Sequence, residues 1–235
     1  MNQTNFNPKS LYLIGGVSAL AQLASILALI VVQAALGPKP AGADEYFAIY
    51  EQNPFEMLLR GDFLLLFLLG AYLGTFPALY IALKRFSPVA VFYAAILTVI
   101  AVVGFFNGES TFALYHLGGQ YAGATSEAVR AQLLAAGQAV IASDSWNSSA
   151  AYLGGIMLQG SGIIVSLVML RSRDFSKVTA ISGLLGNALD LVQHILHPFA
   201  PSFSAPIQMF MGIFYFVWFP MLARDFFKLA KESSN

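Results

Sequence analysis

The residues most able to do chemistry in this sequence are four polar side chains in an otherwise apolar segment. They are separated by three, four and three residues, so a helix would carry them along one face; they are Asn187, Asp190, His194 and His197. An acid at the centre of a bilayer costs roughly 2.5–3.5 kcal/mol on insertion scales. An acid kept within an apolar segment is therefore a candidate functional residue.

Two further candidates follow a second apolar segment. Glu109 lies about as far from the start of that segment as His197 lies from the start of its own, and His116 comes seven residues later. If both segments are helices, the equal rise brings Glu109 and His197 to the same depth. We therefore expect Asp190, His194, His197, Glu109 and His116 to meet at one outer mouth.

The most specific function that these five residues predict is a divalent-metal site, because histidine and carboxylate are ordinary zinc ligands. A carboxylate beside an imidazole can equally relay protons, and a bound metal could activate water for lipid hydrolysis. However, Asp-x3-His-x2-His is not a specific metal motif, and the sequence has no HExxH. The competing interpretation is structural: polar groups near helix ends that meet headgroups, water or one another.

The elements that must position these residues are membrane helices. Of 235 residues, 57% are apolar and 10% are charged, whereas a soluble domain carries roughly 25% charged residues. Continuous apolar runs favour helices over barrel strands, and about 20 helical residues cross a hydrocarbon core. The prediction is an all-α polytopic membrane protein, a single domain over residues 1–235. Its six transmembrane helices are expected at 11–36, 63–83, 88–106, 150–170, 178–196 and 205–223.

Lysine and arginine predict the orientation, since cytoplasmic loops carry an excess of both. Both termini are expected in the cytoplasm, with external loops 37–62 and 107–149. The first apolar run far exceeds a signal-peptide core and is expected to stay as an anchor. The cytoplasmic side would hold Lys9, Lys84, Arg85, Arg171, Arg173, Lys177, Arg224, Lys228 and Lys231, and the external side only Lys39, Arg60 and Arg130.

Both external loops are expected to contain a helix. Residues 44–52 interleave acids with aromatic side chains, which predicts a short interfacial helix with its rings at headgroup depth; the alternative is a lid over an external cavity. In the second loop, Thr125 or Ser126 can cap a helix near 126–142 that has Glu127 in its first turn.

Composition excludes several classes of function. The chain has no cysteine, which excludes disulfides, thiolate zinc sites, iron–sulfur clusters and a cysteine nucleophile. Its formal net charge is zero and it has no basic run, so no nucleic-acid partner is predicted. No organic cofactor is predicted either, and a divalent metal is the one ligand the polar residues suit.

Small residues predict close helix packing. Gly70 and Gly74 form a GxxxG pair, while Gly183 and Gly186 extend the polar stripe of the fifth predicted span. Such faces let helices approach closely. Besides the lipid bilayer, we therefore consider a second copy of the chain or an accessory subunit as a partner on these faces.

Parts of the sequence resemble a family of bacterial integral membrane proteins of about this length, grouped as a domain of unknown function. The resemblance is carried by Gln120-Tyr121-Ala122, Thr125-Ser126-Glu127-Ala128 with Arg130, Leu134-Ala135-Ala136-Gly137, Val168-Met169-Leu170-Arg171-Ser172-Arg173 and Phe175-Ser176. It covers about a third of the chain well. It implies six membrane helices and no activity, and it brings no catalytic residues.

The sequence therefore predicts a multi-pass protein of the bacterial cytoplasmic membrane whose molecular activity is unknown. A structural or accessory membrane component is the first interpretation, and the protein is not expected to be an enzyme. One alternative is a metal-dependent hydrolase or small-ligand sensor that uses the outer Asp/His/Glu cluster. A second alternative is a small transporter or channel, against which the apolar cytoplasmic half of the spans counts.

Overall fold

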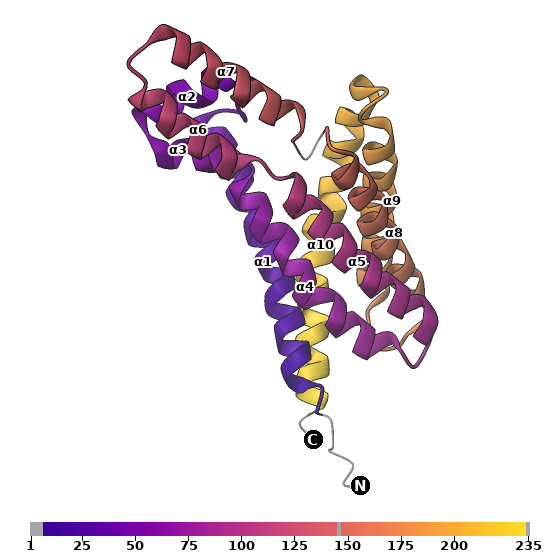
Figure 1. The fold of residues 1–235 in the computed structure, drawn as a ribbon. Helices are drawn as coiled ribbons and strands as arrows, with labels where there is room; N and C mark the ends of the chain where they lie inside the picture. Colours follow the sequence, from indigo (N-terminus) through magenta and orange to yellow (C-terminus); the bar gives the residue numbers. More distant parts are fainter. Residues whose placement is uncertain (1–6, 145–146, 234–235) are drawn as a thin grey trace, which may run out of the picture.

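Residues 7–144 and 147–233, which the computed structural model describes, form ten α-helices and no strand (Figure 1). Six of the helices are long and make a bundle, and four shorter ones make a cap at one end of it. The helices of the bundle are α1 (Lys9–Leu36), α4 (Phe63–Leu83), α5 (Pro88–Gly108), α8 (Ser149–Arg171), α9 (Lys177–Leu196) and α10 (Pro201–Glu232). Those of the cap are α2 (Ala43–Gln52), α3 (Pro54–Arg60), α6 (Thr111–Gly123) and α7 (Glu127–Ala142).

The six bundle helices form a closed ring in chain order. Each packs on the next, and α10 returns to pack on α1. Successive helices run in opposite directions, so both ends of the chain lie at one end of the bundle and the cap lies at the other (Figure 1). We call these the terminal end and the cap end.

Local signals in the sequence explain where α8 and α9 begin. The Ser148 hydroxyl accepts the Ala151 N–H at 3.1 Å at the start of α8, and the Ser176 hydroxyl accepts the Thr179 N–H at 3.0 Å at the start of α9. These are N-caps, which satisfy backbone donors that have no partner within the helix. The carboxylate of Asp225, buried in α10, accepts the Ser176 N–H as well and so fixes the start of α9 against the last helix.

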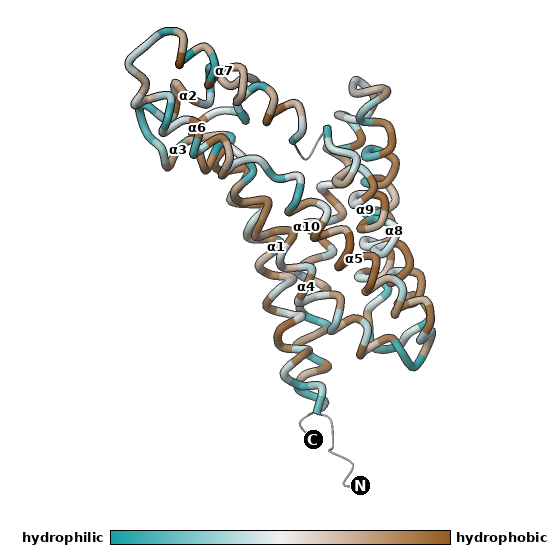
Figure 2. The backbone as a smooth tube through the Cα atoms, viewed as in Figure 1, coloured by the Kyte–Doolittle hydropathy of each residue, from teal (hydrophilic) through white to brown (hydrophobic). Residues whose placement is uncertain are grey.

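Hydrophobic residues predominate along the bundle helices (Figure 2), and many of them are exposed, as a surface in contact with lipid requires. Large aliphatic side chains such as Val17, Val31, Val89 and Val103 are exposed on α1 and α5. Among the described residues, five stretches are long and apolar enough to cross a membrane: Lys9–Leu36, Phe63–Leu83, Pro88–Gly123, Ser149–Arg171 and Ser202–Glu232. The chain is therefore an all-α protein of membrane character.

Helix α9 is the bundle helix that does not reach this level of apolarity. It coincides with the fifth span expected from the sequence, and it packs between α8 and α10. The residues that lower its hydropathy, among them Asn187 and His194, are buried against those two helices. Its polarity thus faces the interior of the bundle.

The cap has a small hydrophobic core of its own, separate from that of the bundle. Tyr46 and Phe47 of α2 are fully buried there, beside Met57 and Leu114 from α3 and α6. The helix expected over 44–52 is present as α2, and these two rings face other helices of the cap. The cause is that loops 37–62 and 107–149 fold together, which neither loop reveals by itself.

Candidate functional site

The polar face of α9 packs into α8 through glycines that leave room for its side chains. A Cβ atom built on Gly155 would lie 2.1 Å from Nε2 of His194, and one built on Gly162 would lie 1.9 Å from Oδ1 of Asn187. Both distances are far below any real contact of a Cβ atom. The α8 glycines are thus required by the α9 side chains opposite them.

Two more pairs continue this seam between the antiparallel helices. Ser166 of α8 lies opposite Gly183 of α9, where a Cβ atom would be 2.7 Å from Oγ. Gln159 and Asp190 face the same hydroxyl, that of Tyr215. Contacting positions on each helix are thus separated by four, three and four residues, the alternation of a heptad seam. In three of the four pairs, a polar side chain on one helix packs against a glycine on the other.

The carboxylate of Asp190 is held at the middle of this seam by α10. The Tyr215 hydroxyl donates to Oδ2 of Asp190 at 2.8 Å, and it lies 3.1 Å from Oε1 of Gln159. A phenol has one proton to donate, so the shorter contact takes it. Three helices thus meet through one hydroxyl, deep in the bundle.

His194 is held at the cap end of the same seam. Its Nε2 lies 3.1 Å from the Tyr152 carbonyl oxygen, and its ring stacks on the Tyr152 ring with centroids 5.7 Å apart. Phe105 of α5 contacts the imidazole edge-on at 6.3 Å. These contacts orient the ring and place one nitrogen against backbone.

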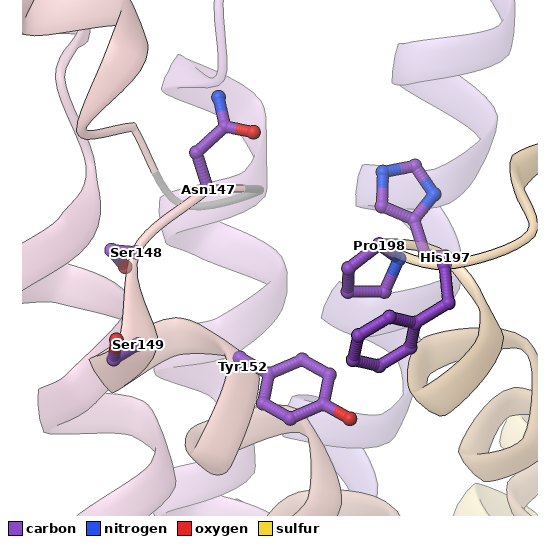
Figure 3. A pocket seen from close by; sticks show the side chains of 7 residues that line it. Asn147, Ser148, Ser149, Tyr152, His197 and Pro198 are labelled. Atoms are coloured by element: carbon purple, nitrogen blue, oxygen red, sulfur yellow. The ribbon is translucent and has the colours of Figure 1, made fainter.

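His197 lines a shallow pocket of about 490 Å³ where α8 begins and α9 ends. Figure 3 shows Asn147, Ser148 and Tyr152 along one side of this pocket and His197 with Pro198 along the other. The pocket is wide open, and none of the described residues that line it is a carboxylate.

The remaining two sequence candidates lie where the bundle meets the cap. Oε1 of Glu109 accepts the Thr111 N–H at 2.7 Å, which fixes the turn between α5 and α6. Nε2 of His116 lies 2.9 Å from Nε2 of Gln120, one turn further along α6. Among the residues that the structure describes, no group of three or more His, Asp or Glu side chains is placed to hold a metal ion. The five predicted ligands are therefore not brought together.

A charged cluster that sequence reasoning missed joins the cap to the bundle. Nζ of Lys39 lies 2.5 Å from Oδ2 of Asp62 and 2.7 Å from Oδ2 of Asp144, so it links three connecting segments of the chain. The Asp62 N–H also donates to the Thr111 hydroxyl at 3.0 Å. We call Lys39, Asp62 and Asp144 the cap clasp. Its sequence signal was weak: single charges next to glycine, proline or a helix end.

Burial and charge act against each other in the cap clasp. Burial lowers the pKa of Lys39, but the carboxylates of Asp62 and Asp144 together with the Tyr46 hydroxyl more than offset it, so the pKa is raised above 10.5. Burial raises the pKa of Asp62 in spite of the Lys39 ammonium beside it. The ammonium is therefore the charge that the cluster stabilises.

A second cavity of about 490 Å³ opens between α1, α4 and α10, in the half of the bundle nearer the cap. Figure 1 shows α1 and α10 diverging in this half, as α1 leads to the cap and α10 stays with α8 and α9. Ile26 and Ile30 form the α1 wall, and Phe216 and Phe219 belong to the α10 wall. We call this space the lateral cavity.

The polar groups at the deep end of the lateral cavity are two tyrosines, Tyr72 of α4 and Tyr215 of α10. Tyr215 connects the cavity to Asp190 behind it, so the acid singled out from the sequence contacts the cavity wall through one hydroxyl. A cavity with mainly apolar walls and a few convergent polar groups is the usual form of a small-molecule site. The sequence predicted Asp190 but not Tyr72, since an aromatic residue in an apolar helix carries no distinguishing pattern.

Comparison with known proteins gives one result. A family model described as a domain of unknown function (DUF4386) matches residues 6–223. Searches of curated proteins and of solved structures found no match.

Proposed function

The chain belongs to the DUF4386 family, a domain of unknown function, and we propose that it is a multi-pass membrane protein that binds a membrane-soluble small molecule in the lateral cavity. The observation that carries this proposal is Tyr215, a residue that lines the cavity and whose hydroxyl is bound to Asp190. An ionisable residue within a membrane helix is costly and usually marks a functional site. Here the acid is bound to a residue that lines a space which a ligand can enter from lipid.

The route of entry follows from the position of the lateral cavity. It lies between helices whose outer surfaces are apolar, and its own walls are mainly aliphatic and aromatic. A ligand already dissolved in the bilayer can reach it sideways without crossing a polar surface. This property suits a receptor or carrier of such a molecule, and it requires no chemical step.

The proposal includes six membrane crossings with both termini in the cytoplasm of a bacterial cell. The ring of alternating helices supports a sixth crossing by α9, whose polar face is buried against α8 and α10. The excess of lysine and arginine at the terminal end supports a cytoplasmic position for that end. The cap would then lie outside, in contact with the outer leaflet.

We do not extend the proposal to metal-dependent hydrolysis or to a partner subunit. The predicted metal ligands are held by different groups: Asp190 by Tyr215, His194 by the Tyr152 backbone and Glu109 by the Thr111 backbone. The glycines expected to bind a partner are occupied within the chain; Gly74, for example, lies against Ser18 of α1.

The test uses two matched glycines. Gly212 lines the lateral cavity and Gly160 does not, and a Cβ atom at either would meet no described atom within 4 Å. Wild type, Gly212→Phe and Gly160→Phe are purified from membranes, and bound molecules are extracted and identified by mass spectrometry. We expect a lipid-soluble molecule in stoichiometric amount with wild type and Gly160→Phe, and its loss with Gly212→Phe. Equal retention by all three proteins, or none with wild type, would contradict the proposal.

A further inference from the structure

The Tyr72 hydroxyl has an unusual position in the lateral cavity. The side chain is only 6% exposed and lines the cavity, yet its hydroxyl makes no hydrogen bond within residues 7–144 and 147–233. The hydroxyl is not among the sealed polar atoms that lack a partner in the described residues, so it is accessible from the cavity. A ligand atom that accepts a hydrogen bond would supply the missing partner.

The second hydroxyl of the cavity is already engaged. Tyr215 donates to Asp190, so its proton is not available to a ligand in this arrangement. Of the two tyrosine hydroxyls, only that of Tyr72 is therefore free to donate to a ligand; the side-chain amides of Gln33 and Gln208 are further donors in the lining. The ligand that the cavity suits must carry an acceptor, such as a carbonyl oxygen, rather than only a donor.

The depth of Tyr72 limits which molecules can place an acceptor there. Tyr72 is nine residues after Phe63, the first residue of α4, which corresponds to about 14 Å along a helix. The hydrocarbon core is about 30 Å thick, so the hydroxyl lies near its middle. Phospholipid headgroups stay at the interface, and the acceptor must therefore belong to a molecule whose polar part enters the hydrocarbon region.

The walls near Tyr72 favour a flat ring. Tyr215, Phe216 and Phe219 supply aromatic surface from α10, and Met209 and Met211 supply polarisable thioethers. Aromatic rings stack or meet edge to face with other rings, and methionine sulfur makes favourable contacts with them. A volume of about 490 Å³ admits a substituted ring and part of a chain.

From this arrangement we infer that the lateral cavity binds a molecule of the quinone class: a flat ring with carbonyl oxygens and an apolar chain, which accepts a hydrogen bond from Tyr72. This inference rests on the proposed function, since it names the ligand of the same cavity. The ring lies between the aromatic side chains of α10 and Tyr72, and the chain extends between α1 and α10 toward lipid. Binding alone is inferred, without electron transfer.

The protein contains a natural reporter for this ligand. Trp218 is fully buried, and its ring centroid lies 5.9 Å from that of Tyr215 and 5.1 Å from that of Phe219. Quinones quench indole fluorescence at short range. The chain has two tryptophans, so a Trp146→Phe background leaves Trp218 as the single emitter.

The experiment titrates this protein, reconstituted in quinone-free phosphatidylcholine vesicles, with a benzoquinone that carries a ten-carbon chain. We expect saturable quenching. Adding Gly212→Phe should abolish the saturable part, and Gly160→Phe should leave it unchanged. Tyr72→Phe should raise the dissociation constant about fivefold, the effect of one neutral hydrogen bond, with an unchanged unfolding temperature as the control for folding.

Quenching that rises linearly with quinone in every variant would overturn the inference, because it reports only partition into lipid. Saturation that Tyr72→Phe does not weaken would also overturn it, since the hydrogen bond is its basis. The extraction experiment distinguishes failure of the quinone assignment from failure of the proposed function. If a different molecule is retained by wild type and lost from Gly212→Phe, the quinone assignment fails and the proposed function stands; if none is retained and quenching is linear, both fail.

Discussion

The imidazole of His194 occupies the space that a side chain on residue 155 would need. A Cβ atom built on Gly155 would lie 2.1 Å from Nε2, 2.3 Å from Cε1 and 2.4 Å from Cδ2, so the whole edge of the ring faces the glycine. The ring cannot move aside easily, because it is bonded to the Tyr152 carbonyl and stacked on the Tyr152 ring. The polar side chains of α9 can therefore pack here only because α8 has glycine at the facing positions.

This relationship predicts a strong dependence on the residue at position 155. Gly155→Ala should destabilise the protein by about 1–3 kcal/mol, the usual cost of inserting atoms into a packed interior. Gly160→Ala, on the same helix but with open space around its Cβ, should be neutral or stabilising, since alanine favours a helix over glycine by about 1 kcal/mol. Thermal unfolding of the detergent-solubilised proteins measures both. Similar unfolding temperatures for the two variants would show that the seam tolerates a larger residue.

The two tyrosines of the lateral cavity should differ in stability although the same atom is removed from each. Tyr215→Phe leaves Asp190 and Gln159 without their shared partner in the bundle, at a cost of about 1–3 kcal/mol. Tyr72→Phe removes a hydroxyl that makes no hydrogen bond within the described parts of the chain, so its cost should be near zero. Chemical denaturation in mixed micelles compares them. An equal loss for both variants would mean that Tyr72 is paired after all.

The cap clasp predicts a stability effect in the alkaline range. Lys39→Met removes the ammonium between Asp62 and Asp144 and should cost about 3 kcal/mol at pH 8. Because the folded-state pKa of Lys39 is raised, the stability it supplies is fully present below pH 10.5 and is lost as pH rises above that value. The difference between wild type and Lys39→Met should therefore shrink by about 1.4 kcal/mol per pH unit. A difference that stays constant from pH 8 to 11.5 would contradict this prediction.

Single cysteines can test the topology, since the natural chain has none. Gly123 in the cap, Phe199 after α9 and Arg173 before α9 are exposed positions. In spheroplasts, a membrane-impermeant maleimide should label Gly123→Cys and Phe199→Cys, and it should label Arg173→Cys only after the membrane is opened. If Arg173→Cys and Phe199→Cys react alike, α9 does not cross the membrane.

The bundle could be predicted well from the sequence because a long, continuous apolar run is stable as a helix that spans the membrane. Span 63–83 coincides with α4, and span 178–196 differs from α9 by one residue at its start. Helices lying in lipid must satisfy their own backbone, so hydropathy along the chain locates them, although α10 extends beyond the expected span 205–223 at both ends. Ser126, one of the two capping residues expected for α7, accepts the Val129 N–H.

The site was harder to predict because its parts are distant along the chain. Asp190 drew attention as an acid in an apolar segment, but its partner Tyr215 is one of many aromatic residues in α10. Helical periodicity places residues on a face but does not say which helix that face meets. Equal rise along two helices predicts that Glu109 and His197 lie at the same depth. In the structure, the turn between α5 and α6 directs Glu109 toward Thr111 at the base of the cap. The rise per residue gives the depth of a residue along the helix axis, but it does not give the position of that residue across the bundle.

The closed ring of helices has a consequence for how the molecule is assembled. Every contact around the ring joins bundle helices that follow one another along the chain, except that between α1 and α10, which joins the two ends of the chain. In a chain inserted from its N-terminus, each new bundle helix can therefore pack on the one before it. The contact between α1 and α10 can form only after α10 has been synthesised. The lateral cavity is bounded by that final contact. The lateral cavity is therefore complete only when the whole chain has been synthesised. A truncated chain without α10 would keep the contacts among the other bundle helices but would have no ligand site.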